Sequence, residues 1–73
     1  MTTATATATA ARADFINTSA AEAEKLADET QDKATRAIVA GYAKSAREAA
    51  ADGRWNAARA CLDQAWYYAE TQE

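Results

Sequence analysis

The side chains that could carry chemistry are mostly charged, and the nucleophiles have no partners. The chain of 73 residues contains no histidine and a single cysteine, Cys61. Disulfide scaffolds, cysteine zinc sites and Cys–His or Ser–His catalysis are therefore excluded. No basic residue shares a helical face with Cys61, so we expect a buried structural thiol. The only glycines, Gly41 and Gly53, cannot form a phosphate-binding loop. We predict a protein that is not an enzyme and that has no cofactor or metal site.

Charged residues separate along the chain into an acidic part and a basic part. Residues 14–32 hold six carboxylates and one lysine, a net charge of −5, and residues 33–59 hold six bases and two acids, a net charge of +4. The candidate acidic surface comprises Glu22, Glu24, Asp28, Glu29 and Asp32. The basic part includes Lys33, Arg36, Lys44 and Arg47, which share one stripe of a predicted helix.

Three interpretations of this charge separation are open. The charges could form a solvated face, or lie on neighbouring helices whose opposite signs determine how the helices pack. The basic stripe could dock an acidic protein, or it could contact the phosphates of a nucleic acid. In a further alternative, the acidic helix imitates nucleic acid or occupies a basic groove on another protein.

Three consecutive aromatic residues form the second candidate surface. Successive positions on a helix point about 100° apart, so Trp66, Tyr67 and Tyr68 cannot all face one core. We place Trp66 inside, Tyr68 at the edge and Tyr67 towards the polar side. The two tyrosines could shield the rim of the core, with their hydroxyls in water. They could instead form an association surface with Arg54 and Arg59, since Tyr and Arg are frequent at interface hot spots.

The chain divides into a low-complexity start and one small helical domain. Residues 1–13 alternate Thr and Ala, which offers no apolar face worth burying, so we expect a flexible tail there. Residues 14–73 form the domain. Its first helix is predicted over 19–31, because Ser19 and Glu22 have capping-box spacing. Phe15 and Ile16 stand just before Ser19, where they could fold back as a hydrophobic staple.

Two further helices are predicted with clearer ends. Asp32 is a candidate N-cap for a helix over 33–51, although no Gly or Pro excludes one continuous helix from the first to the second. Gly53, after Asp52, can adopt the left-handed conformation that ends a helix. The last helix is predicted over 54–71. The fold class is all-α, a small bundle of two to three helices with a C-terminal antiparallel αα-hairpin.

The core must be thin in large side chains. Although 49% of the residues are hydrophobic, 23 of them are alanine. Close contacts between helices must therefore provide the stabilisation that large buried side chains would otherwise give. On the helical wheels the inner positions include Ile38 and Tyr42 in the second helix and Trp55 and Leu62 in the third. The predicted structural core is Leu26, Ile38, Tyr42, Trp55, Ala58, Leu62, Ala65 and Trp66.

The second half of the chain resembles a single tetratricopeptide-repeat hairpin. The resemblance covers residues 39–72 and rests on Gly53, Trp55, Ala58, Leu62 and Ala65, with Tyr42 at the family's Trp position and Ala46 at its first small position. Ser45, Ala49 and Glu70 depart from the pattern, and no second copy occurs one 34-residue period earlier. The resemblance implies two helices in close antiparallel contact, in one hairpin and not in an array.

These features favour a small non-catalytic module that binds another protein of unknown identity. Size and alanine content are typical of accessory proteins of phages and mobile elements that occupy a host complex, including anti-CRISPR proteins. The alternatives are a nucleic-acid-binding accessory protein and a structural homo-oligomer with Trp55, Trp66 and Tyr68 at its interface. No stretch approaches 18 strongly apolar residues and no basic region precedes an apolar start, so we predict neither a membrane span nor a secretion signal. A single unpaired cysteine fits a reducing cytoplasm.

Overall fold

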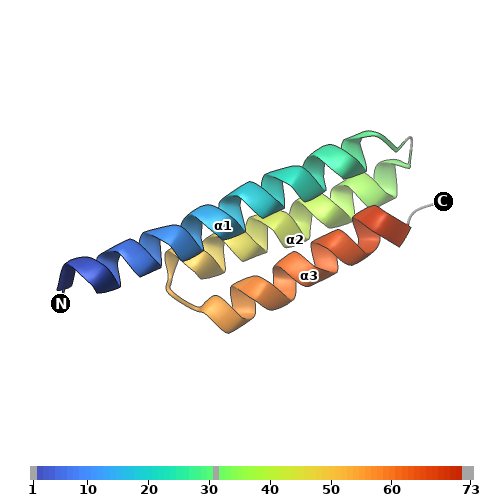
Figure 1. Cartoon of the computed structure of the whole chain (residues 1–73). Coiled ribbons are helices and arrows are strands. Elements are labelled where there is room, and N and C mark those ends of the chain that lie inside the picture. Colours follow the sequence, from blue (N-terminus) through green and yellow to red (C-terminus); the bar gives the residue numbers. More distant parts are fainter. Residues whose placement is uncertain (1, 31, 72–73) are drawn as a thin grey trace.

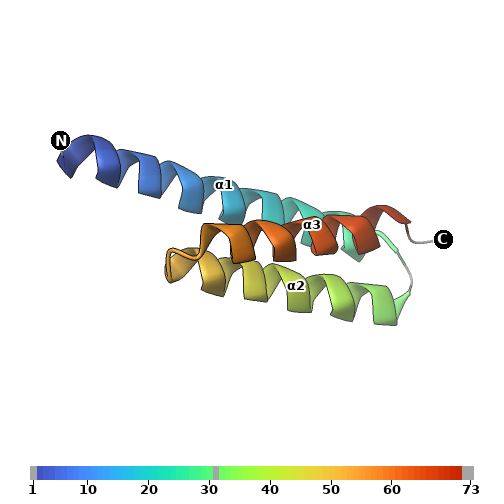
Figure 2. The same cartoon turned by 90° about the horizontal axis from the view of Figure 1, so that it is seen from below.

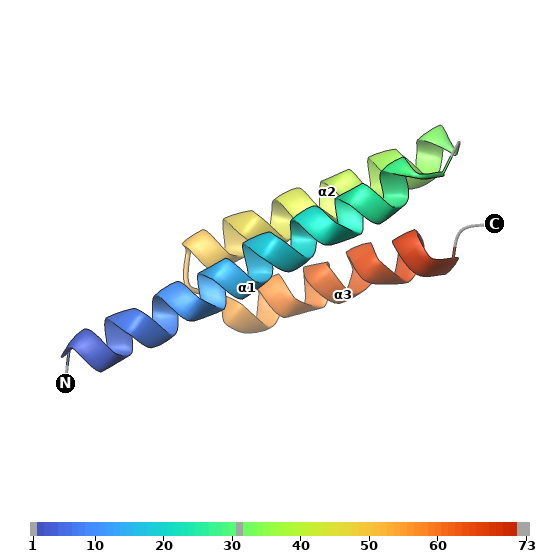
Figure 3. The same cartoon turned by 45° about the horizontal axis from the view of Figure 1, so that its top comes forward.

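The computed structural model is an elongated bundle of three helices, 48 Å long and 17 by 14 Å across. It describes residues 2–30 and 32–71, and their side chains from residue 10 onward. The helices are α1 (Thr2–Asp28), α2 (Lys33–Ala51) and α3 (Trp55–Thr71). Consecutive helices are antiparallel, and α1 lies lengthwise along the α2–α3 hairpin (Figures 1 and 3). The predicted all-α bundle is confirmed.

The first helix differs from its prediction at both ends. It begins at Thr2 where a tail was expected, and it ends at Asp28; Met1 and Gln31 lie outside the described residues. Alanine is the best helix former, and no Gly or Pro interrupts residues 2–28, so the helix continues through the Ala/Thr repeat. The predicted helix start at Ser19 is wrong. Ser19 lies inside α1, and its hydroxyl accepts a hydrogen bond from Nε1 of Trp66 at 2.9 Å.

The predicted break between the first two helices is confirmed, and a polar network forms it. Asp32 caps α2 by accepting the backbone N–H of Ala34 at 3.0 Å. It also accepts the Thr35 hydroxyl at 2.7 Å. These two bonds, that from Thr35 first, lower the pKa of the Asp32 carboxyl. The Arg36 guanidinium donates to the backbone carbonyl of Thr30 at 2.6 Å, which connects the first turn of α2 to the segment that follows α1.

The connection between α2 and α3 is the predicted glycine stop. Gly53 has φ +76°, in the left-handed region. The N–H of Arg54 donates to the carbonyl of Ala49 at 2.9 Å, and the N–H of Gly53 donates to the carbonyl of Ala50 at 3.1 Å. These are the two bonds of a Schellman motif. They satisfy the last carbonyls of α2 and turn the chain into α3.

Alanines fill most of the interior, as expected from the composition. One core cluster surrounds Leu62 and the other surrounds Val39, and these two are the largest fully buried side chains. Because the remaining core positions are nearly all alanine, the three helices approach closely. The buried set is Ile16, Ala20, Ala23, Ala27, Val39, Ala43, Ala46, Ala49, Ala50, Ala58, Leu62, Ala65 and Ala69.

The predicted core needs one correction. Ala58, Leu62 and Ala65 are buried as predicted. Four larger members pack against the clusters but remain partly exposed, namely Leu26, Tyr42, Trp55 and Trp66. Ile38 is 40% exposed, so its assignment to the core is wrong. The buried face of α2 is centred on Val39 and Ala43, because α2 contacts α1 on one side and α3 on the other.

The helices differ in length, and this difference shapes one end of the molecule. α1 has 27 residues and α2 has 19, so α1 is about 12 Å longer at 1.5 Å per residue. Its N-terminal turns project beyond the α2–α3 connection (Figures 1 and 2). Among the α1 side chains that the structure describes, from residue 10 onward, the first deeply buried one is Ile16. A step therefore forms where α1 leaves the hairpin.

Candidate protein-binding surface

The basic stripe of α2 lies beside α1. Two of its four residues contact α1 or the segment that follows α1. Arg47 pairs with Glu24 at 2.5 Å, and both side chains are about two-thirds buried. Arg36 donates to the Thr30 carbonyl. Lys33 and Lys44 are exposed and form no ion pair within the described part of the chain. The stripe thus contributes to helix packing, which is the first of the three interpretations of the charges.

The predicted acidic surface is also divided between roles. Glu24 pairs with Arg47, and Asp32 caps α2. Glu22, Asp28 and Glu29 are exposed and lie outside every ion pair among residues 10–30 and 32–71. The five carboxylates therefore do not converge on one site.

The tyrosines form a ring cluster between α2 and α3. Tyr42 stacks on Tyr68 with centroids 5.9 Å apart and planes 8° apart. Tyr67 meets Tyr68 edge-on at 5.2 Å and is 57% exposed. The predicted positions of Tyr67 outside and Tyr68 at the edge agree with this geometry. The stack fills the seam between the two helices, and Tyr67 alone presents most of its ring to solvent.

A concave surface lies at the step where α1 leaves the hairpin. We call it the aromatic groove; it is open, measures about 400 Å³ and runs between α1 and the start of α3. Phe15 from α1 and Trp55 from α3 provide its apolar walls. Phe15 is 52% exposed, so it is not the buried staple that the sequence predicts. The groove is lined by Ala11, Arg12, Phe15, Ile16, Trp55, Asn56 and Arg59.

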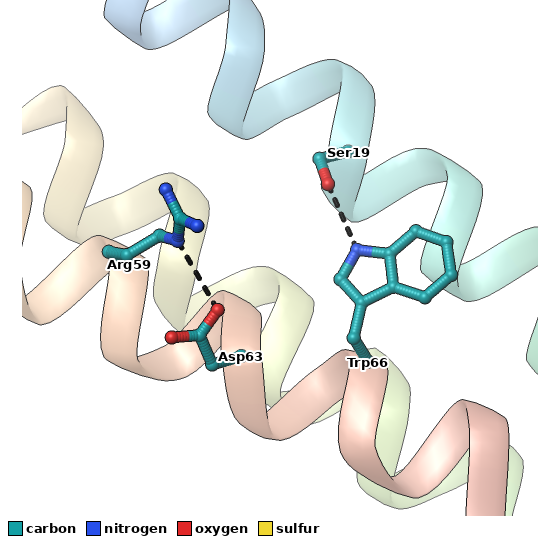
Figure 4. Close-up of polar contacts among 4 residues, drawn as sticks. All are labelled: Ser19, Arg59, Asp63 and Trp66. Carbon is teal, nitrogen blue, oxygen red and sulfur yellow. Dashed lines mark hydrogen bonds and ion pairs between the residues drawn. The ribbon is translucent and has the colours of Figure 1, made fainter.

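Two arginines lie over the aromatic rings of the groove. The Arg12 guanidinium carbon is 5.8 Å from the Trp55 ring centroid, and that of Arg59 is 5.6 Å from the Phe15 ring centroid. At these distances each cation is attracted by the negative face of its ring. Arg59 also donates from Nε to Asp63 at 3.2 Å, one turn along α3 (Figure 4). Arg59 was a candidate binding residue predicted from the sequence, whereas Arg12 and Phe15, which precede the predicted first helix, were not.

A hydrogen bond between the side chains of Trp66 and Ser19 connects α3 to α1. It joins the middle of α3 to the middle of α1, next to the ion pair of Arg59 and Asp63 (Figure 4). Trp66 thus contributes an apolar face to the core and its only polar atom to α1.

The remaining candidate residues do not add reactive chemistry to the groove. Arg54 pairs with Asp52 at 3.2 Å on the exposed α2–α3 connection. Cys61 is a free, half-buried thiol that packs against the cluster around Leu62. Among the described residues, no group of three His, Cys, Asp or Glu side chains could hold a metal ion. No helix in the same part of the chain is long and apolar enough to span a bilayer.

Comparison with known proteins adds no relative. The sequence matches no model of a known protein family, no curated protein and no solved structure. The tetratricopeptide resemblance therefore stays a resemblance of one hairpin.

Proposed function

We propose that this chain is a non-catalytic protein-binding module and that the aromatic groove is its binding surface. The observation that carries the proposal is the half-exposed Phe15 ring beside Trp55. Burying a large apolar side chain is worth about 1.5–3 kcal/mol. A chain with so few large side chains forgoes roughly half of that gain at Phe15, and a bound partner would recover it.

The composition of the groove is that of a protein interface. Aromatic and arginine side chains dominate hot spots, where a rigid ring fills a pocket and a guanidinium donates several hydrogen bonds. The groove combines Phe15 and Trp55 with Arg12 and Arg59. Its volume of about 400 Å³ suits one or two inserted side chains.

An accessory role for a phage or mobile element belongs to the same proposal. A protein of this kind acts by occupying a surface on a host complex, as anti-CRISPR proteins do, and it needs only a stable fold and one binding surface. The support for this part is the small size and the alanine-rich composition.

The two alternative functions find less support. Nucleic-acid binding through the basic stripe would require Arg36 and Arg47, which are engaged with Thr30 and Glu24. The homo-oligomer would require Trp66 and Tyr68 at its interface. Trp66 instead donates to Ser19, and Tyr68 stacks on Tyr42 within one chain.

The test compares the wild-type chain with two variants, each changed at one exposed apolar residue, as baits for a partner. The wild-type chain, Phe15→Ser and Ile38→Ser are each used to capture partners from the native host, with bound proteins identified by mass spectrometry. Ile38 is the matched control because it is also exposed, at 40%, but lies on α2 outside the groove. We expect one partner that the wild type and Ile38→Ser retain and Phe15→Ser loses.

The opposite pattern would contradict the proposal. If Phe15→Ser keeps the partner and Ile38→Ser loses it, the groove is not the binding surface. If capture depends on nucleic acid and disappears after nuclease treatment, the alternative function replaces this one. Circular dichroism of each variant establishes that the helices are intact.

A further inference from the structure

The charge around the aromatic groove differs in sign from the charge of the whole chain. Its lining includes Arg12 and Arg59 and no carboxylate. A second hollow continues from it around the start of α3 and adds Arg54, again without a carboxylate. The chain as a whole has a net charge of −3. Positive charge is therefore concentrated beside the exposed Phe15 ring and the partly buried Trp55 ring.

The three arginines retain hydrogen-bond donors that no residue of the described chain uses. Arg12 has no carboxylate partner among the described residues, and its guanidinium lies over the Trp55 ring. Arg59 uses Nε for Asp63, and its two terminal nitrogens point away from that carboxylate (Figure 4). Arg54 gives one nitrogen to Asp52. Since a guanidinium has five N–H donors, each of these arginines can still bind a carboxylate.

Acidic residues limit the direction in which a partner can extend. A hollow on the far side of Phe15 is lined by Asp14 and Glu22 together with Ser19. A partner's negative charge would be repelled there and attracted on the α3 side, by Arg12, Arg54 and Arg59. The charge thus changes sign across the Phe15 ring, from positive on the α3 side to negative on the far side.

We infer that the aromatic groove binds an acidic peptide segment in which one large apolar side chain stands between carboxylates. This inference rests on the proposed function and names the chemistry of the partner. The apolar side chain inserts between Phe15 and Trp55, and the flanking carboxylates accept hydrogen bonds from Arg12 and Arg59. A nucleic acid, although it also suits rings and arginines, carries a phosphate at every nucleotide and would meet Asp14 or Asp63 on either side.

The experiment selects peptides and then locates them on the structure. A displayed library of random twelve-residue peptides is selected on the wild-type chain, and the most enriched peptides are synthesised. Each is titrated into 15N-labelled protein while the two indole N–H signals, from Trp55 and Trp66, are followed by NMR. We expect Asp or Glu on both sides of Leu, Phe or Trp in the enriched peptides. We also expect a shift of the Trp55 signal that exceeds that of Trp66.

Two double variants of equal charge test the arginines. Arg12→Gln with Arg59→Gln removes two positive charges at the groove, and Lys33→Gln with Lys44→Gln removes two from exposed sites on α2. The first variant removes two exposed ion pairs to the peptide, so we expect about a tenfold loss of affinity. The second should stay within about twofold of wild type, since its charges lie away from the peptide.

The outcomes separate this inference from the proposed function. Neutral or basic peptides that shift the Trp55 signal, or acidic peptides whose affinity is unchanged by the arginine variant, would overturn the inference and leave the groove as a protein-binding surface. If no peptide shifts Trp55 while a twelve-nucleotide oligo(dT) does, both the inference and the proposed function are wrong.

Discussion

Close packing through alanine is the property of this bundle most open to a direct test, and Ala65 is the position to perturb. Ala65 is fully buried in α3, in the cluster that contains Ala23 and Ala27 of α1 and Val39 of α2. A leucine there would place three additional carbons where three helices meet. Ala60, on the exposed side of α3, is the matched control for the same substitution.

The expected cost follows from packing alone. Alanine and leucine have nearly equal helix propensity, so neither Ala65→Leu nor Ala60→Leu changes the helix intrinsically by more than a few tenths of a kcal/mol. Adding methylene groups to a filled core costs about 1–3 kcal/mol. A domain of this size loses about 4–8 °C in Tm per kcal/mol, so Ala65→Leu should melt roughly 4–24 °C lower. Ala60→Leu should stay within about 0.5 kcal/mol of wild type.

The assay is equilibrium urea unfolding, followed by tryptophan fluorescence and by far-ultraviolet circular dichroism. Coincident transitions by the two probes establish two-state unfolding and allow the free energies to be compared. An unchanged or increased free energy of unfolding in Ala65→Leu would refute the reasoning. It would mean that the helices have room between them, and that the alanines do not determine how closely they approach.

Three further predictions concern the turns and the contact between α1 and α3. Gly53→Ala should lower the free energy of unfolding by about 1 kcal/mol because of its positive φ, whereas Gly41→Ala, in an exposed and open helix position, should raise it by about 0.5–1 kcal/mol; urea midpoints of both variants check this. Ser19→Ala removes the acceptor of the Trp66 indole and should cost about 0.5–1.5 kcal/mol, with faster solvent exchange of that N–H in NMR; an unchanged exchange rate would contradict the contact. The lowered pKa of Asp32 means that its stabilising effect is present above about pH 4 and is lost as the pH falls through the lowered value. The Tm of wild type should therefore fall towards that of Asp32→Ala in acid, while Asp32→Asn, which still caps the helix, should lack this part of the pH dependence.

Both ends of α2, and with them the start of α3, could be predicted because local signals determine them. Asp32 caps a helix through its own neighbours, and Gly53 ends one through its own backbone conformation. The start of α1 has no such signal. Ser19 has the spacing of a cap, and only the position of Trp66, 47 residues later, shows that its hydroxyl serves a contact between helices.

The site was harder to predict because it depends on how three helices are rotated against one another. The helical wheel of α2 alone predicts that Ile38, the larger side chain, is buried. Val39 is buried instead, because α2 packs against both α1 and α3. Phe15 looks like a staple until α1 continues past it, which leaves the ring at the surface. Arg59 could be chosen as a candidate from its residue type. Its contact with the Phe15 ring could not be predicted, since the two residues lie on different helices.

The greater length of α1 has a consequence for insertions and deletions. Arg12 and Phe15 belong to the same rigid helix as the core residue Ile16, so their direction is set by counting residues back from the core. One residue inserted between Asn17 and Ala20 would rotate everything before it by about 100° and move it about 1.5 Å, which would turn Phe15 away from Trp55. Residues added before Arg12 would lengthen the helix without changing that phase. The geometry of the aromatic groove therefore tolerates added residues at the N-terminal end of α1 but no insertion in the turn that joins Phe15 to the core.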